Sequence, residues 1–238
     1  MCLIAIAHNA STKWPLVIAA NRDELYARPT RPAHVWDDDP RIVGGRDLQA
    51  GGSWLAARQG GRFAAITNVR GIGRGEGGPS RGLLVADFVR GDESPMVYAE
   101  SIAGNEYAGF YLIVGDGHVV HCSNSGVIGT IDGFFAISNA PPGSKWEKVD
   151  VARDFLAEAI DRYDRAEDLA DDLLGFLSTR RGGPIEREIF VTSPSYGTRS
   201  STVILCDAFG DFLFVEQNYS ASGVRDGKPL RYRLPFTT

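Results

Sequence analysis

The chain opens with two short apolar runs, residues 2–8 and 16–20, joined by the turn-rich connector 9–15. Each run is almost continuously apolar, which predicts a strand buried on both faces. If the runs pair as an antiparallel hairpin centred near residue 12, residue 8 lies opposite residue 16 and residue 2 opposite residue 22. This register returns the polar segment 21–24, which contains an arginine and two acids, to Cys2.

The same strand and helix patterns continue along the chain. Strands are predicted at 53–58, 62–67, 109–115, 118–123, 134–137, 186–191, 201–206 and 212–215. Helices are predicted at 81–90 after a Ser80 cap, from Pro95 to Gly104 after a Ser94 cap, and at 146–163 and 166–178. The proline-containing stretch 25–50 is expected to be irregular. Strands, helices and strands again, without repeats or a linker, predict one α+β domain over residues 1–238, in which helices cover antiparallel sheets.

Composition and charge narrow the class of protein. Apolar residues make up 43% and charged residues 23% of the chain, as in soluble globular proteins. The net charge of −5 argues against a nucleic-acid partner. No basic leader precedes the first apolar run, and no run approaches the roughly 20 residues of a membrane span. We therefore expect a cytoplasmic protein without stable membrane insertion.

Neither a metal nor a cofactor is expected. Cys2, Cys122 and Cys206 are odd in number and widely spaced, which fits a reducing compartment better than a disulfide framework or a zinc site. His118 and His121 lie three apart on a predicted strand, so their side chains point to opposite faces. A glycine-rich motif at 73–78 matches the dinucleotide-binding pattern, but it is not placed directly between a strand and a helix, which favours a loop.

Cys2 has two interpretations. If Met1 is removed, Cys2 carries a thiol of pKa about 8.5 and an α-amine of pKa about 7.7–8.0, which makes it a nucleophile with its own base. Alternatively, Cys2 is a small apolar residue that begins a buried strand, since free cysteine is among the most buried residue types. Position alone favours the second interpretation.

Three further polar residues also have two interpretations each. Asn68 and Asn139 each follow an apolar strand and precede a turn. Asparagine there either shapes the turn or aims an amide donor into a cleft, as in an oxyanion hole. Arg199, in the polar segment 196–201, is either a solvated residue at the end of a strand or an anchor for an anion.

Several of these stretches together resemble the NRDE family, which is named for its Asn-Arg-Asp-Glu motif and includes the transport and Golgi organization protein. The matching motifs are Met1-Cys2, residues 19–24, Arg28-Pro29, residues 51–55, residues 65–68, residues 80–82, Gly109-Phe110, residues 138–140 with Trp146, and residues 196–199. They occur in order from Met1 to about residue 217. The family is more distantly similar to N-terminal-nucleophile hydrolases of the choloylglycine hydrolase and penicillin V acylase type, which implies a four-layer αββα sandwich.

The resemblance implies a role for each candidate site residue. Cys2 would be the nucleophile, and Asp23 would hold its α-amine. Asn68 would line the site, Asn139 would donate to the oxyanion, and Arg199 would match a late arginine near the nucleophile.

The segment after the second strand departs from the acylase pattern. The acylases have Arg-Asn-x-Asp there, whereas this chain has Ala20-Asn21-Arg22-Asp23. A shift of two residues keeps the arginine on the same face of a strand but moves it by about 6.6 Å. Arg22 is therefore a candidate charge partner for the Cys2 thiolate, but the acylase pattern does not assign it this role.

Two functions fit the sequence. The first is a hydrolase or acyltransferase that acts on a C–N amide or acyl-thioester bond of a small or acylated metabolite, with Cys2 as nucleophile after Met1 removal. A retained Met1 would move the α-amine away from Cys2 and leave the mechanism without its base. The alternative is a non-catalytic protein of the same fold that binds or moves a hydrophobic metabolite such as a lipid, acyl-CoA or haem. No histidine is an obvious haem ligand.

Overall fold

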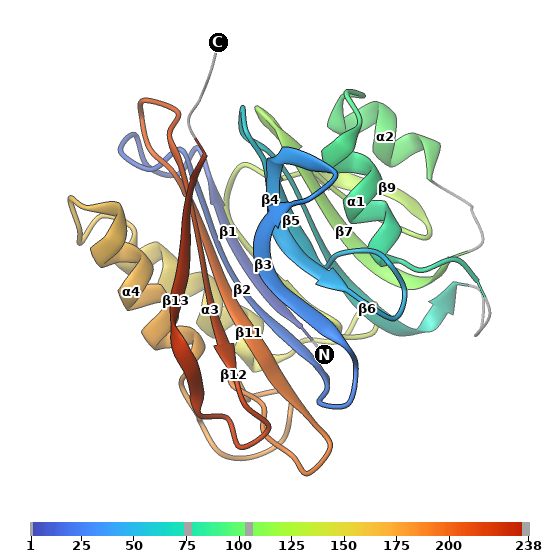
Figure 1. Ribbon diagram of the computed structural model, residues 1–238, viewed down its shortest axis with the longest axis vertical. Helices are drawn as coiled ribbons and strands as arrows, with labels where there is room; N and C mark the ends of the chain where they lie inside the picture. The colour runs from blue at the N-terminus through green and yellow to red at the C-terminus, as the bar shows by residue number, and fades with distance from the viewer. Residues whose placement is uncertain (1, 74–77, 103–106, 235–238) are drawn as a thin grey trace. The chain divides into compact units, whose positions relative to one another are not determined.

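The structure, a computed structural model, describes residues 2–73, 78–102 and 107–234 (Figure 1). Within these ranges the backbone forms a six-stranded and a seven-stranded antiparallel sheet and four helices, so the predicted α+β class is confirmed. The chain divides into two compact units. One comprises Met1–Arg28, Asp132–Ser138 and Ser144–Pro235, and the other contains Pro29–Ile131 and Asn139–Gly143. No described helix combines the length and the apolar character that crossing a membrane requires.

The first unit is built around the two apolar runs at the start of the chain. Its described strands, in spatial order, are β10 (Gly133–Ser138), β1 (Leu3–His8), β2 (Leu16–Leu25), β11 (Tyr196–Cys206), β12 (Phe212–Tyr219) and β13 (Arg225–Leu234). Helices α3 (Glu147–Ala159) and α4 (Ala166–Leu177) cover one face of this sheet (Figure 1). Leu3 and Val17 on the strands pack with Leu156 and Leu173 on the helices. Alternation along each strand directs these apolar side chains to the helices.

The predicted hairpin register is confirmed. His8 pairs with Leu16 and Leu3 pairs with Asn21 in an antiparallel ladder. Every residue of β1 is buried, as expected for a strand with partners on both sides. The second partner is β10, where Ser138 lies opposite Leu3. Continued by one residue, the register of β1 and β2 sets Cys2 opposite Arg22.

The second unit has its own sheet and core. Its described strands, in spatial order, are β3 (Thr30–Trp36), β4 (Asp39–Asp47), β5 (Leu55–Arg58), β6 (Arg62–Gly73), β7 (Ala108–Asp116), β8 (His118–Ser123) and β9 (Gly126–Thr130). Helices α1 (Gly82–Arg90) and α2 (Pro95–Ser101) pack on it. Trp36, Ala64 and Leu112 on the strands share a core with Leu84 and Phe88 on α1.

Arg62 fastens the end of α1 to this sheet. Its guanidinium, almost fully buried, stacks 3.7 Å above the centre of the Phe88 ring. Its Nε and Nη2 donate to the carbonyl oxygens of Phe88 and Glu93, both at 2.7 Å, and its Nη1 donates to Asp116 at 2.7 Å. These bonds satisfy carbonyls at and just beyond a helix end, where intrahelical donors run out.

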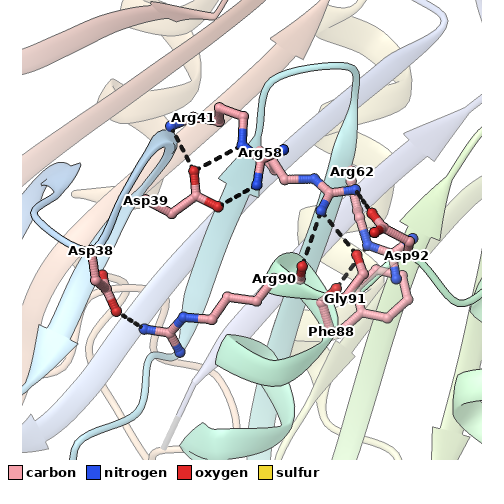
Figure 2. A network of polar contacts seen from close by, with 9 residues as sticks. All are labelled: Asp38, Asp39, Arg41, Arg58, Arg62, Phe88, Arg90, Gly91 and Asp92. Carbon is pink, nitrogen blue, oxygen red and sulfur yellow. Dashed lines mark hydrogen bonds and ion pairs between the residues drawn. The ribbon is translucent and has the colours of Figure 1, made fainter.

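Arg58 adds a second set of donors at the same helix end. Its Nη1 donates to the carbonyl oxygens of Arg90 at 3.2 Å and Gly91 at 2.9 Å, and its Nη2 donates to Asp92 at 2.9 Å. Figure 2 shows Arg58 and Arg62 turned toward this end of α1. A cationic side chain near the C-terminus of a helix also interacts favourably with the helix dipole.

The prediction of a strand at 186–191 was wrong. The apolar residues Ile189 and Phe190 are buried, but they belong to a turn-rich segment rather than to a sheet. The Phe190 N–H donates to the carbonyl of Thr179, and the Ile189 carbonyl accepts from Asn21, so both backbone groups are satisfied outside any ladder. An apolar run of this length therefore indicates burial but does not identify a strand.

The stretch 25–50 was also wrongly expected to be irregular, because it contains β3 and β4. β3 is the edge strand of its sheet, and an edge position tolerates the missing N–H of Pro32.

At the helix starts, the Ser94 cap of α2 is confirmed, since its Oγ accepts from the Val97 N–H at 3.3 Å. Arg81 rather than Ser80 occupies the cap position of α1. The expected helix stop at Gly104 lies outside the described residues, and so does most of the glycine-rich motif at 73–78.

Candidate functional site

Cys2 lies at the open end of the β1–β2 hairpin. It directly precedes β1 and is half-buried, with its thiol reduced. The sulfur accepts a hydrogen bond from the backbone N–H of Asp23. The hairpin register therefore brings Cys2 together with Arg22 and Asp23, as the sequence predicted. Met1 lies outside the described residues.

The Asp23 carboxylate is held from the neighbouring strand. Asp23 is buried and pairs with Thr198 of β11, whose Oγ1 donates to its Oδ1 at 2.7 Å. The Val191 N–H in turn donates to the Thr198 hydroxyl at 2.9 Å, and the Tyr196 hydroxyl donates to the Asp23 carbonyl at 2.8 Å. These contacts fix both the side chain and the backbone of Asp23.

Burial dominates the ionisation of both groups. It raises the pKa of the Cys2 thiol, and the Asp23 carboxylate raises it further, whereas the Asp23 backbone N–H and the Arg22 guanidinium lower it. Burial likewise raises the pKa of the Asp23 carboxyl, against the Thr198 hydrogen bond and the charges of Lys148 and Arg22. The cysteine is accordingly a thiol at neutral pH, and a base has to remove its proton before it can attack.

Lys148 is a charged neighbour of this pair that the sequence analysis did not identify. It lies in the first turn of α3, and its side chain is fully buried, with its Nζ 5.1 Å from the centre of the Trp146 ring. Burial lowers the pKa of Lys148, and the charges of Asp23 and Cys2 oppose that effect. A signal was present in the sequence, because Lys148 lies four residues before Ala152 and so occupies the apolar stripe of the helix.

The remaining residues of the Asn-Arg-Asp-Glu motif have different surroundings. Asn21 is buried and donates from its Nδ2 to the carbonyl oxygens of Leu177 and Ile189, both at 2.8 Å. Its Oδ1 accepts from the Ser201 hydroxyl at 2.6 Å. Asn21 therefore supports the segments packed on the hairpin rather than facing a substrate.

Arg22 is buried, and its Nη2 lies 3.9 Å from the Glu24 carboxylate. The same carboxylate oxygen lies 3.9 Å from the Nε of Arg28. The charge of Arg22 is thus partly balanced by Glu24, and its contribution to the Cys2 thiol is the smallest of those named above.

Arg199 occupies an irregular position in β11, where the pairing with β2 shifts between Thr198 and Ser200. Its Nη1 donates to the carbonyl oxygens of Leu25, Tyr26 and Arg28 at 3.0–3.2 Å. Arg199 therefore holds the turn that follows β2. Its proposed role beside the nucleophile stays a prediction.

Asn68 and Asn139 belong to the second unit. Asn68 is an exposed residue of β6 that pairs with Phe110 of β7. Asn139 directly follows β10 and is buried, and its Oδ1 has no hydrogen-bond partner within the described part of the chain. A buried amide oxygen of this kind is uncommon in folded proteins. The roles of both asparagines beside Cys2 stay predictions.

Solved structures identify the class of fold. The chain is similar to the Caenorhabditis elegans N-acylethanolamine-hydrolyzing acid amidase ortholog, with a TM-score of 0.53 and 14% identity over 86% of this chain and 92% of that one. It is also similar to the C2A mutant of the conjugated bile acid hydrolase from Clostridium perfringens, with a TM-score of 0.57 and 9% identity over 98% of this chain and 92% of that one. The fold is that of the N-terminal-nucleophile hydrolases, as predicted.

The sequence comparisons identify the family. The family model described as Transport and Golgi organisation 2 matches residues 1–221, so the chain belongs to this family. The Transport and Golgi organization protein 2 homologs of Bos taurus and Homo sapiens are 31% and 29% identical to it, over 93% and 92% of this chain and 94% and 93% of their own lengths. The Drosophila melanogaster protein is 26% identical over 91% of this chain and 92% of its own length.

Proposed function

We propose that this protein is a cysteine hydrolase that cleaves a C–N amide or acyl-thioester bond of a small or acylated metabolite. The observation that carries the proposal is the contact of the Cys2 thiol with the backbone N–H of the buried Asp23, at the open end of the hairpin. The names of the two similar proteins of solved structure, an acid amidase and a conjugated bile acid hydrolase, support the same class of reaction.

The chemistry follows from a thiol that has to be deprotonated. With Met1 removed, the α-amine of Cys2 takes the thiol proton and the thiolate attacks the carbonyl carbon of the substrate. Asp23 holds the resulting ammonium, and a backbone N–H together with Asn139 would stabilise the oxyanion. The C–N bond breaks, the ammonium returns its proton to the leaving nitrogen, and water hydrolyses the acyl-thioester to release the acid and restore Cys2.

The test replaces the nucleophile. In Cys2→Ala we expect normal folding by circular dichroism and a loss of at least about a hundredfold in the hydrolysis of acyl amides and acyl thioesters, as for removal of a nucleophile. Cys206→Ala is the matched control, because it removes another thiol, at the far end of β11, that has no amine or carboxylate of the candidate site beside it. Unchanged hydrolysis in Cys2→Ala would exclude Cys2 as the nucleophile.

Processing of Met1 is a separate requirement of this mechanism. Intact-mass measurement of the purified protein should show a chain that lacks the initiator methionine and begins at Cys2. A homogeneous chain that retains Met1 would place the α-amine on the wrong residue and would contradict the α-amine as the base.

A second candidate function is supported by the names of the relatives, which refer to transport and Golgi organization. In this case the same fold would bind a hydrophobic metabolite such as a lipid, acyl-CoA or haem without cleaving it. Equilibrium binding of fatty-acyl ligands separates the two functions. A transport protein would return the ligand intact and would bind it equally well in Cys2→Ala, whereas a hydrolase would release the free acid. The expected cytoplasmic location stays a prediction, and the family name is the reason to examine Golgi-related transport as well.

A further inference from the structure

A fully buried lysine that interacts electrostatically with the cysteine has no part in the mechanism above. Lys148 is inaccessible to solvent, and its Nζ has no hydrogen-bond partner within the described residues. Lysine is almost never fully buried unless it is paired with an opposite charge. The position of Lys148 therefore calls for a compensating anion nearby.

The surroundings of Lys148 hold it in place. Its backbone N–H donates to the Glu186 carbonyl at 3.1 Å, and the Trp146 ring lies below its Nζ. Helix α3 packs on β1 and β10, so its first turn is fixed against the strand that begins directly after Cys2. The lysine is therefore built into the same unit as the cysteine and is not a mobile surface side chain.

The charges that face Lys148 come from three elements. Cys2 precedes β1, Asp23 lies on β2, and Glu186 and Glu188 belong to the segment between α4 and β11. Glu186 and Glu188 are only half-buried, so water screens them more than it screens Asp23.

Arg22 also acts on this cluster, and its Nη2 lies 3.9 Å from the Glu24 carboxylate. Lys148 adds a second, fully buried positive charge that acts on both Asp23 and Cys2.

We propose that Lys148 is a positioning residue of the Cys2 site, whose ammonium neutralises the Asp23 carboxylate and stabilises the Cys2 thiolate after the thiol proton has left. Lys148 keeps its own proton throughout, and the thiol proton passes to the base, which is the α-amine during turnover and solvent hydroxide during alkylation. The role of Lys148 in turnover rests on the proposed function. The effect of Lys148 on the ionisation of the Cys2 thiol does not.

The test follows the thiol directly and requires no substrate. The rate of Cys2 alkylation by iodoacetamide is measured against pH, with the labelled peptide quantified by mass spectrometry so that Cys122 and Cys206 are counted apart. Lys148→Met is expected to move the midpoint of the Cys2 profile to higher pH, so that alkylation at neutral pH slows about tenfold for each pH unit of movement. Lys148→Arg keeps the positive charge and is expected to restore the profile.

Lys145→Met is the matched control, because it removes the same charge from an exposed lysine three residues earlier and should leave the profile unchanged. If Lys148→Met and Lys145→Met give the same profile as the wild type, Lys148 does not stabilise the thiolate. If Lys148→Arg moves the profile as far as Lys148→Met does, packing rather than charge is responsible and the proposal is overturned.

A variant with both charges removed keeps the test valid if Lys148→Met does not fold. Asp23→Asn with Lys148→Met leaves no unbalanced buried charge, and its profile should lie at higher pH than that of Asp23→Asn alone. Equal profiles in these two variants would overturn the proposal. The Cys2 alkylation profile could also move as expected in a protein that hydrolyses none of the amides or thioesters. That result would support Lys148 as the residue that stabilises the thiolate and would reject the proposed hydrolase function.

Discussion

At the scale of single residues, the structure contains buried ionisable groups outside the candidate site. His121 on β8 is 7% exposed, and its ring lies edge-on to Tyr111 with the ring centres 5.5 Å apart. Burial lowers the pKa of His121 from 6.5 to about 4. The native protein therefore keeps this imidazole neutral in a pH range where the unfolded chain protonates it.

This difference predicts acid sensitivity. The unfolded state binds more protons than the native state between about pH 6.5 and pH 4, so stability is fully present above pH 6.5 and is lost as the pH falls toward 4. The shift corresponds to about 3 kcal/mol in the free energy of unfolding. In His121→Phe this loss should disappear from urea-unfolding curves measured across the range. His118→Phe, at an exposed position of the same strand, should retain the wild-type slope. Parallel slopes in all three proteins would contradict the assignment.

At the scale of elements, one side chain joins the hairpin to the segments that pack on it. Asn21 on β2 donates to carbonyls of Leu177 at the end of α4 and of Ile189 in the turn-rich segment that follows, and it accepts from Ser201 on β11. Asparagine is suited to this position because its amide offers two donors and an acceptor in one plane.

Asn21→Ala is therefore expected to lower the free energy of unfolding by about 3 kcal/mol, because it leaves two buried carbonyls without donors. Ser201→Ala removes one of these hydrogen bonds and should cost about 1 kcal/mol. Urea unfolding of both variants measures the difference. A cost for Asn21→Ala no larger than that for Ser201→Ala would show that the carbonyls find other donors.

The sequence predicted the elements whose pattern is regular. The β1–β2 register followed from two apolar runs and one connector, and α3 and α4 followed from the spacing of their apolar residues. It did not predict β3 and β4, because prolines and exposed positions interrupt the alternating apolar pattern in both strands. It misassigned 186–191, because burial by packing gives the same apolar run as a strand. Lys148 was missed because a charged residue on an apolar helix face is treated as an interruption of the face, and only the fold shows what lies opposite.

The candidate site could be predicted only in part, for a related reason. Cys2, Arg22 and Asp23 meet through one local hairpin, so simple counting along the chain brings them together. Thr198 reaches Asp23 only because β11 pairs with β2 across most of the chain length, and no local pattern encodes that pairing. The resemblance named Arg199, but the structure directs its Nη1 to the turn after β2.

At the scale of the whole molecule, each of the two compact units carries its own sheet and its own pair of described helices. In the second unit, Arg58 and Arg62 tie the end of α1 to its sheet. Substitutions at these arginines should therefore act first on the second unit.

Arg62→Met is expected to destabilise the protein by about 3 kcal/mol, since it leaves the buried carbonyls at the end of α1 without a donor. Hydrogen exchange should show the largest loss of protection in α1 and β6. Arg153→Met, which breaks exposed ion pairs on α3, is the control and should cost less than about 0.5 kcal/mol. Equal loss of protection across both units would mean that they unfold as one and that the effect of Arg62 is not confined to its own unit.

The order of strands in the first unit has a consequence for how the protein is made. The β1–β2 hairpin emerges from the ribosome before its neighbours β10 and β11, which lie more than a hundred residues later in the chain. At a synthesis rate of about 5–20 residues per second, the nascent hairpin waits on the order of ten seconds or longer for either neighbour. During that interval both of its apolar edges are open to pairing with other chains. Chaperones that shelter nascent chains should therefore raise the yield of folded protein.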